Sequence, residues 1–320
     1  MTIREELAQE YLANGYWAGT TVAGALDRAV EAFPDRLALV CGGQRLTYRE
    51  LRTRAHHLAR GFLDRGLGRG DVVTVQMPSW PEYVYVHYAL ARIGAITLPT
   101  IPQYRRKEMA QILAFSRSTG YVLPARFAGF DYLKMLEEMR PELSHLRHIF
   151  VAGEPAPPSA HSIQAMLAEE PRALLPPEAT AHHQEVACMV VTGGTTGSPK
   201  AVPRTHDELV CHARNWAVVL EATPESTFLV PVPLTHVFGL VEGFYIPLTT
   251  GARVLLMDRF EPAEALAPKR SCTRSRLAWD ATSSASTACL KAPFPLPSGA
   301  IRPRSRASPW ARPIARGRNS

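Results

Sequence analysis

The chain has 320 residues, enough to bury a sizeable core in one large domain or two, and 46% of them are hydrophobic. Its formal net charge of +7 comes from the end of the chain, because residues 268–320 hold eleven of the 36 Lys and Arg and one of the 29 Asp and Glu. Residues 1–267 keep 25 basic and 28 acidic side chains, a net of −3, which excludes a basic surface along the whole chain for nucleic acid.

The N-terminus is charged and lacks an apolar core of the signal-peptide kind, and no apolar run is long enough to span a membrane. Five cysteines show neither C-x-x-C pairing nor metal-ligand spacing, and Cys41 and Cys188 lie in apolar runs. We therefore expect a reduced, cytoplasmic protein with no membrane span and no metal site built on cysteine.

Strands and helices alternate through the first half of the chain. Residues 22–33 form an amphipathic helical pattern, and a hairpin is expected over 37–47 around Gly42-Gly43. The sequence from Thr47 to Glu50 predicts a capping box that opens a helix with Leu51, Ala55, Leu58 and Phe62 on its apolar face. Strands are then predicted at 72–77, 95–98, 121–123 and 148–151, and helices at 81–93 and 107–115. This order indicates an α/β fold with doubly wound, largely parallel sheets and helices on both faces.

The second half continues with strands at 186–191, 228–230 and 253–257 and an apolar helix from Gly239 to about Leu248. A second capping box, from Thr205 to Glu208, opens a further helix. Proline-rich segments near 155–159 and 175–177 mark a crossing, so we expect a first α/β subdomain over 1–180 and the start of a second over 181–267. Residues 268–320 lose all periodicity, which predicts a disordered tail.

A glycine- and threonine-rich loop follows the apolar strand at 186–191. Its polar residues are Thr192, Gly193, Gly194, Thr195, Thr196, Gly197, Ser198 and Lys200. Glycines let successive backbone N–H groups converge on an anion, hydroxyls add neutral donors, and the lysine adds a positive charge, which suits a polyphosphate. It is not the common P-loop, because Pro199 and Ala201 stand where that motif needs Gly and Ser or Thr. The alternative is a surface loop with a solvated lysine.

This string resembles the phosphate-binding signature of the adenylate-forming superfamily, which includes acyl-CoA synthetases, aryl acid–AMP ligases and luciferases. Further segments match the family's blocks in order and rough spacing, from about residue 15 to about residue 267: Gly15-Tyr16-Trp17, Leu46 to Leu51, Gly94 to Pro99 and Pro233 to Gly239. The resemblance implies the incomplete large N-terminal domain of that fold.

The resemblance also implies a reaction. In this family the carboxylate of an acid attacks the α-phosphate of ATP, giving an acyl adenylate and pyrophosphate, and the acyl group then passes to a thiol. It implies ATP and Mg²⁺ as cofactors, CoA or the phosphopantetheine of a carrier protein as acceptor, and a small carboxylic acid as substrate. An aryl carrier protein is the expected protein partner, and no nucleic acid is expected.

Site residues are carried over by motif. The nucleotide site is expected at Thr192, Gly193, Gly194, Thr195, Thr196, Gly197, Ser198 and Lys200, with Lys200 meeting the β/γ end of the phosphates. His236 matches the family's acid-pocket histidine, where its role is steric and hydrogen-bonding, and Val237 and Gly239 belong to the same pocket. His236 and Lys200 are the expected catalytic residues. The alternative for His236 is a satisfied core histidine.

Two parts of the chain indicate different subfamilies. Pro203-Arg204-Thr205-His206 resembles the aryl acid–AMP ligases of the 2,3-dihydroxybenzoate type, which fits siderophore biosynthesis. Those ligases usually have Asn after the pocket histidine, whereas Val237 is closer to acyl-CoA synthetases. Arg204 and His206 either relay to phosphate or begin a helix, and we favour the helix. The pairs His56-His57 and His182-His183 are expected in solvent.

The family's later blocks have no match after about residue 267. They hold an acidic residue for Mg²⁺ and adenine, an Asp for the ribose and a C-terminal catalytic Lys, so no metal-binding residue is assigned here. We expect the chain as written to be inactive and poorly soluble, with a tail that is translated out of frame or is a natural basic segment. The alternative to a ligase is a non-catalytic fragment or pseudogene product.

Overall fold

The computed structural model describes residues 5–169, 175, 180–192, 200–236, 238–257 and 288–290. The α-helices are α1 (Glu5–Ala13), α2 (Val22–Ala32), α3 (Tyr48–Asp64), α4 (Pro81–Arg92), α5 (Arg106–Ser116), α6 (Tyr132–Met139), α7 (Ile163–Ala168), α8 (His206–Val219) and α9 (Ile246–Thr250). A 3₁₀ turn spans Arg140–Glu142 and a π-helix spans Phe238–Tyr245. The strands are β1 (Leu37–Cys41), β2 (Gln44–Thr47), β3 (Val72–Gln76), β4 (Ile96–Thr100), β5 (Gly120–Pro124), β6 (Arg126–Phe127), β7 (Phe130–Asp131), β8 (His148–Ala152), β9 (His161–Ser162), β10 (Val186–Thr192), β11 (Lys200–Thr205), β12 (Thr227–Val230), β13 (Arg253–Leu256) and β14 (Ala288–Leu290).

Two larger sheets organise these elements. The seven-stranded sheet has the order β11-β10-β4-β3-β5-β8-β9, and all its neighbours pair in parallel except β10 and β11. The five-stranded sheet has the order β14-β12-β13-β1-β2, with β12, β13 and β1 parallel. The largely parallel α/β fold that the alternating pattern predicts is confirmed.

The two sheets exchange strands from distant parts of the chain. The N-terminal hairpin β1–β2 joins the five-stranded sheet through β1 and β13, with Leu39 opposite Val254. The later hairpin β10–β11 joins the seven-stranded sheet through Cys188 and Thr97. The predicted subdomain boundary at residue 180 therefore does not coincide with the division between the sheets. Of the segment 268–320, only β14 is described, and it pairs with β12.

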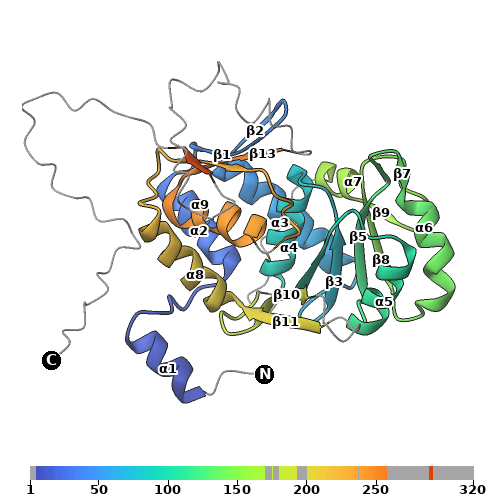
Figure 1. Cartoon of the computed structure of the whole chain (residues 1–320), viewed down its shortest axis with the longest axis horizontal. Helices are drawn as coiled ribbons and strands as arrows, with labels where there is room; N and C mark the ends of the chain where they lie inside the picture. Colours follow the sequence, from blue (N-terminus) through green and yellow to red (C-terminus); the bar gives the residue numbers. More distant parts are fainter. Residues whose placement is uncertain are drawn as a thin grey trace, which may run out of the picture.

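Helices α2, α3, α4, α8 and α9 fill the space between the sheets and share one apolar core with both of them (Figure 1). The apolar face predicted for α3, from Leu51 to Phe62, is buried there. Helices α5 and α6 cover the opposite face of the seven-stranded sheet with a second core. Strand β5 serves both cores, because Tyr121 and Leu123 face the second while Val122 faces the first. Helices thus cover both faces of this sheet, as predicted.

Both predicted capping boxes are present. The backbone N–H of Thr47 donates to Glu50 Oε2 at 2.7 Å, and that of Thr205 donates to Glu208 Oε2 at 2.9 Å. In each box the threonine hydroxyl accepts a backbone N–H in return. Each threonine therefore begins its helix, α3 or α8, at the residue that the sequence predicts.

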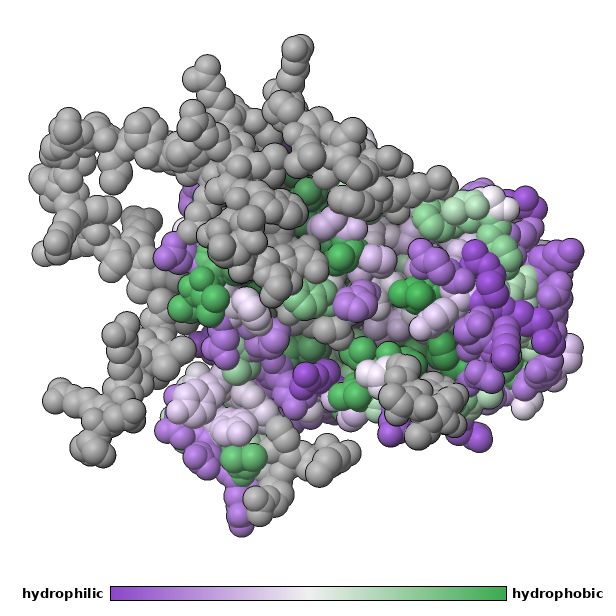
Figure 2. Space-filling model, in the orientation of Figure 1, coloured by the Kyte–Doolittle hydropathy of each residue, from purple (hydrophilic) through white to green (hydrophobic). Residues whose placement is uncertain are grey.

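Hydrophilic side chains gather over the outer surface at the end of the molecule where α6 lies (Figure 2).

Candidate functional site

The candidate phosphate site begins at the paired ends of β10 and β11. Thr192 and Lys200 face each other in the antiparallel register, and the Thr192 hydroxyl donates to the Lys200 carbonyl oxygen at 3.5 Å. Both residues are exposed. The hairpin therefore presents a hydroxyl and an ammonium at the two ends of the connecting segment. The predicted nucleotide-binding residues between them lie outside the described residues: Gly193, Gly194, Thr195, Thr196, Gly197 and Ser198.

The other end of this hairpin is fixed to helix α8. The backbone N–H of His206 donates to the carbonyl oxygen of Glu185 at 3.1 Å, and that of Asp207 donates to the carbonyl oxygen of His183 at 3.0 Å. His206 is fully buried, and its Nδ1 accepts the backbone N–H of Val22 at 3.2 Å. These contacts favour the helix-start interpretation of His206 over a phosphate relay.

The prediction that His183 is a solvated histidine is wrong. Its Nδ1 forms a hydrogen bond with Oδ2 of Asp207, whose side chain is fully buried at the first turn of α8. The sequence could not reveal this pair, because the two residues are 24 positions apart and come together only when the hairpin folds back. The pair adds a further link between the base of the hairpin and α8.

The candidate acid-side segment is the turn from Pro233 to Gly239, which follows β12. The His236 backbone N–H donates to the Pro233 carbonyl oxygen at 2.9 Å, and its own carbonyl oxygen accepts the N–H of Leu240 at 3.0 Å. Its imidazole Nδ1 accepts the N–H of Phe238 at 3.2 Å. In the neutral ring this acceptor role leaves the proton on Nε2. His236 is exposed, so it is not the satisfied core histidine of the alternative interpretation.

This turn is anchored to the seven-stranded sheet. The backbone N–H of Leu234 donates to the buried Ser79 hydroxyl at 3.1 Å, and Ser79 lies in the loop that follows β3. Val237, which the sequence assigns to the acid pocket, lies outside the described residues. Among the described residues, no hydrogen bond or ion pair joins Lys200 to His236. Lys200 and His236 thus lie on separate segments, the hairpin β10–β11 and the turn after β12, each of which is attached to the core.

Gly239 is the tightest point of the turn. A Cβ atom there would lie 2.3 Å from the carbonyl oxygen of Pro233 and 2.8 Å from its carbonyl carbon. Because both atoms are backbone, the Gly239→Ala variant is expected to lose about 1–3 kcal/mol of unfolding free energy. Urea unfolding measures this loss. Gly43→Ala is the control, since its Cβ would meet nothing within 4 Å; equal stabilities of the two variants would contradict the prediction.

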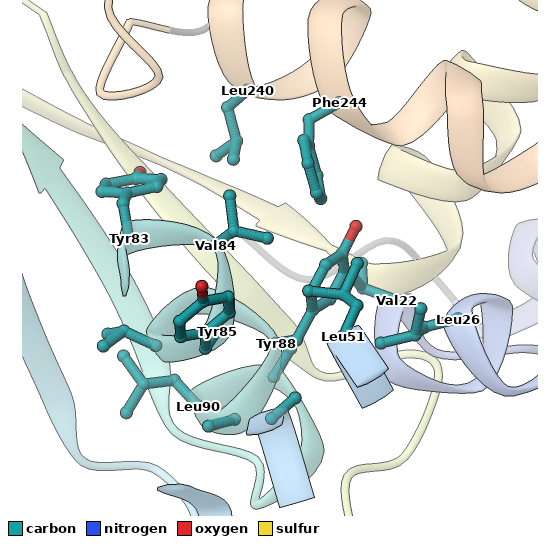
Figure 3. Close-up of a cluster of buried hydrophobic side chains, with 14 of the residues drawn as sticks. Val22, Leu26, Leu51, Tyr83, Val84, Tyr85, Tyr88, Leu90, Leu240 and Phe244 are labelled. Carbon is teal, nitrogen blue, oxygen red and sulfur yellow. The ribbon is translucent and has the colours of Figure 1, made fainter. Parts of the chain in front are cut away.

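The segment after Gly239 differs from the predicted α-helix over 239–248. It is a π-helix, Phe238–Tyr245, followed by the short helix α9. Its buried residues Leu240 and Phe244 point toward α4, where Phe244 contacts Tyr88 at a ring-centroid distance of 5.3 Å (Figure 3). The π-helix is rare in proteins and is frequent at functional sites. No sequence rule for apolar periodicity distinguishes them from α-helix.

The described residues suit part of the expected cofactor set. An exposed ammonium and hydroxyl at one hairpin are the donors that a polyphosphate requires, so Thr192 and Lys200 fit ATP. For Mg²⁺ the described part of the chain offers no group of three or more His, Cys, Asp or Glu side chains that could hold a metal. Within the same residues, none of the helices combines the length and apolar character needed to cross a bilayer.

Comparisons with known proteins agree with these motifs. The AMP-binding enzyme family model matches residues 26–292, which extends beyond residue 267. The 2,3-dihydroxybenzoate-AMP ligase of Bacillus subtilis is 34% identical over 264 residues, 82% of this chain and 47% of that protein. The medium-chain fatty-acid–CoA ligase of Escherichia coli is 29% identical over 277 residues, 85% of this chain and 49% of that protein.

Among solved structures, the apo structure of MbtA from Mycobacterium smegmatis superimposes with a TM-score of 0.73 at 29% identity, covering 80% of this chain and 47% of that one. The chain thus spans about half the length of the relatives that it matches. Sequence motifs, fold and family model agree over most of the chain: it belongs to the family of AMP-binding enzymes, the adenylate-forming ligases.

Proposed function

We propose that this chain is the N-terminal part of an ATP-dependent acid–AMP ligase that acts on an aryl carboxylic acid. The observation that supports this most is the hairpin β10–β11, which presents Thr192 and Lys200 on either side of the glycine-rich segment 193–199. Family membership adds the reaction type, and the relative with 34% identity is a 2,3-dihydroxybenzoate-AMP ligase.

The proposed chemistry activates a carboxylate. Its oxygen attacks the α-phosphorus of ATP, the bond from that phosphorus to the bridging oxygen breaks, and pyrophosphate leaves with the electron pair. A carboxylate is already nucleophilic, so the step needs positioning and charge neutralisation rather than a general base. Lys200 would neutralise charge at the phosphate end, and the Nε2–H of His236 would donate a hydrogen bond on the acid side. The acyl group then passes to the thiol of CoA or of a carrier protein.

Mg²⁺ supplies further neutralisation of phosphate charge when it is bound. The described residues give no ligand set for it. The chain spans 47% of its 2,3-dihydroxybenzoate-AMP ligase relative, and we propose that the residues completing the nucleotide and metal sites lie in the remaining part.

The second candidate is an acyl-CoA synthetase. Val237 follows the pocket histidine where the dihydroxybenzoate-type ligases usually have Asn, and the Escherichia coli relative is a fatty-acid–CoA ligase. A ring hydroxyl would lose one hydrogen-bond partner at this position. Exchange of pyrophosphate into ATP, measured on a chain extended to the length of the relatives with a panel of aryl and aliphatic acids, separates the two acid classes. A second assay with CoA and with a carrier protein identifies the acceptor thiol. Turnover only with aliphatic acids would contradict the aryl assignment.

Lys200 provides a direct test on the chain itself. A charge-assisted hydrogen bond contributes roughly 1.5–3 kcal/mol, so Lys200→Ala is expected to weaken ATP binding by roughly tenfold to 150-fold. Isothermal titration with ATP measures the change, and Lys134→Ala, an exposed lysine on α6, is the control. Equal ATP affinity in Lys200→Ala and the unmodified chain would reject the phosphate role of Lys200. Absence of ATP binding in the unmodified chain would favour a non-catalytic fragment.

A further inference from the structure

A chain of three polar side chains lies inside the core between the sheets. His87 Nδ1 lies 3.1 Å from the Thr97 hydroxyl, and His87 Nε2 is hydrogen-bonded to the Tyr245 hydroxyl. The three side chains are at most 2% exposed. Polar groups in such surroundings are costly to bury unless they are hydrogen-bonded, and here both nitrogens of the imidazole have a hydroxyl partner.

These three residues come from three different elements. His87 is on the central helix α4, whose residues from Tyr83 to Ala91 are all buried. Thr97 is on β4, and its register partner on the neighbouring strand is Cys188 of β10. Tyr245 is the last residue of the π-helix. The polar chain therefore joins the strand beside the phosphate hairpin to the π-helix that follows the acid-side turn.

The hydrogen bonds of His87 constrain the relative orientation of the side chains that they join. Burial lowers the pKa of His87 to about 3, so its imidazole is neutral near pH 7, with one N–H and one lone pair. A hydroxyl donates or accepts as required, so Thr97 and Tyr245 satisfy either tautomer. A hydrogen bond fixes both distance and direction, whereas the apolar contacts of Leu240 and Phe244 are non-directional. The bond to Tyr245 thus fixes the rotation of the π-helix.

Two neighbouring tyrosines provide a comparison within the same core. Tyr83 and Tyr88 are fully buried on α4, and within the described residues neither hydroxyl has a hydrogen-bond partner. The ring of His87 lies 6.4 Å from the ring of Tyr83 and 6.0 Å from that of Tyr88. The core thus contains tyrosines without a hydrogen-bond partner among the described residues, Tyr83 and Tyr88, beside tyrosines that make specific bonds, such as Tyr245 to His87, and Tyr48 on α3, whose hydroxyl donates to the carbonyl oxygens of Pro247 and Ala252.

We propose that His87 and Tyr245 are positioning residues that fix the π-helix, and with it the turn that holds His236, relative to β4 and the phosphate hairpin. This inference rests on the proposed function, because it assigns the acid to the side of His236. Neither residue touches the reacting atoms. Their effect is to set the spacing between the two halves of the site, which an in-line attack on the α-phosphate requires.

Hydrogen exchange of the 320-residue chain, followed by mass spectrometry of its peptides, tests the positioning directly. Removing the hydroxyl in Tyr245→Phe leaves a buried nitrogen of His87 without its partner, at a cost that corresponds to roughly fivefold to thirtyfold faster exchange. We expect this increase in peptides covering 234–246, and unchanged rates in β3 and β5. Tyr88→Phe is the matched control, since it removes a buried hydroxyl that has no hydrogen-bond partner among the described residues. A uniform increase along the chain, or the same pattern in Tyr88→Phe, would overturn the proposal.

A second experiment measures the effect of these residues on the KM for the acid. In a chain extended to the length of the relatives, Tyr245→Phe is expected to raise the KM for the acid at least fivefold with the KM for ATP unchanged. His87→Gln, whose amide can still bond the Tyr245 hydroxyl, is expected to restore part of the loss that His87→Leu produces. Equal changes in both KM values would overturn the positioning role. If the unmodified extended chain activates no acid, the proposed function fails while the exchange experiment still decides whether the bond positions the π-helix.

Discussion

Acidification from pH 6.5 to pH 4.5 is expected to lower the unfolding free energy of the chain by on the order of 4 kcal/mol, through two buried histidines. Burial lowers the pKa of both His87 and His206 to about 3, against about 6.5 in an unfolded chain. Between pH 6.5 and about pH 3 these two histidines are therefore protonated in the unfolded state and neutral in the folded state. The contribution of the two neutral histidines to the unfolding free energy is fully present above pH 6.5. It decreases as the pH falls, and it decreases no further below about pH 3, where the folded state also binds the protons.

The two histidines resist protonation for related reasons. His206 is buried, lies near His87, His183 and His182, and uses Nδ1 to accept the backbone N–H of Val22. A proton on Nδ1 would remove that bond. The window ends at pH 4.5 because carboxylates, with unfolded pKa values of about 4, contribute below it.

Urea unfolding at pH values from 7.0 to 4.5 measures this dependence. The control is His206→Asn, whose amide oxygen can still accept the Val22 N–H but does not titrate. Its unfolding free energy should fall about half as steeply with pH. An unchanged slope in this variant, or no loss of stability in the unmodified chain above pH 4.5, would show that the histidines are not the cause.

The variant Phe62→Ala is expected to lose about 3–5 kcal/mol of unfolding free energy. Phe62 on α3 is fully buried, and its ring meets that of Phe150 on β8 edge to face at 4.7 Å. Truncation removes both this contact and the apolar surface of the ring, and it leaves a cavity between a helix and a sheet that other elements fix in place. The fixed surroundings prevent the site from collapsing, so the loss falls in the range typical of core phenylalanines.

Guanidinium unfolding measures the effect of Phe62→Ala. The matched control is Phe115→Ala on α5, where the phenylalanine is 50% exposed and its loss should change stability by less than about 0.5 kcal/mol. A loss below about 1 kcal/mol in Phe62→Ala would mean that α3 moves toward β8 to fill the cavity.

Local sequence signals predicted α3 and α8 and their starts well, whereas α1, α6 and α7 were not predicted. The apolar period of α3 and the capping boxes at Thr47 and Thr205 depend on residues three or four positions apart, so the sequence alone determines them. The family motifs likewise indicated the strand and loop that lead to Lys200 and the segment around His236, whereas strand β11 and its pairing with β10 were not predicted.

Contacts between distant residues could not be predicted in this way. The hydrogen bonds of His183 to Asp207 and of His87 to Tyr245 depend on how hairpins and helices pack, and no spacing rule marks them. The π-helix was predicted as an α-helix, because apolar residues dominate the segment and both forms bury them. His87 did carry a weak signal: a histidine one helical turn after Tyr83, on a helix without an exposed face, must find polar partners inside the core.

The parallel pairing of β1 with β13 has a consequence for synthesis. Leu39 is synthesised long before its pairing partner Val254, which lies 215 positions later in the chain. At about 5–20 residues per second a ribosome needs roughly 10–40 s to make that stretch. During this interval the hairpin β1–β2 emerges with one edge of β1 open and its apolar residues uncovered. Strand β1 therefore has to be kept from pairing with a wrong strand until β13, near the end of the described fold, has been synthesised.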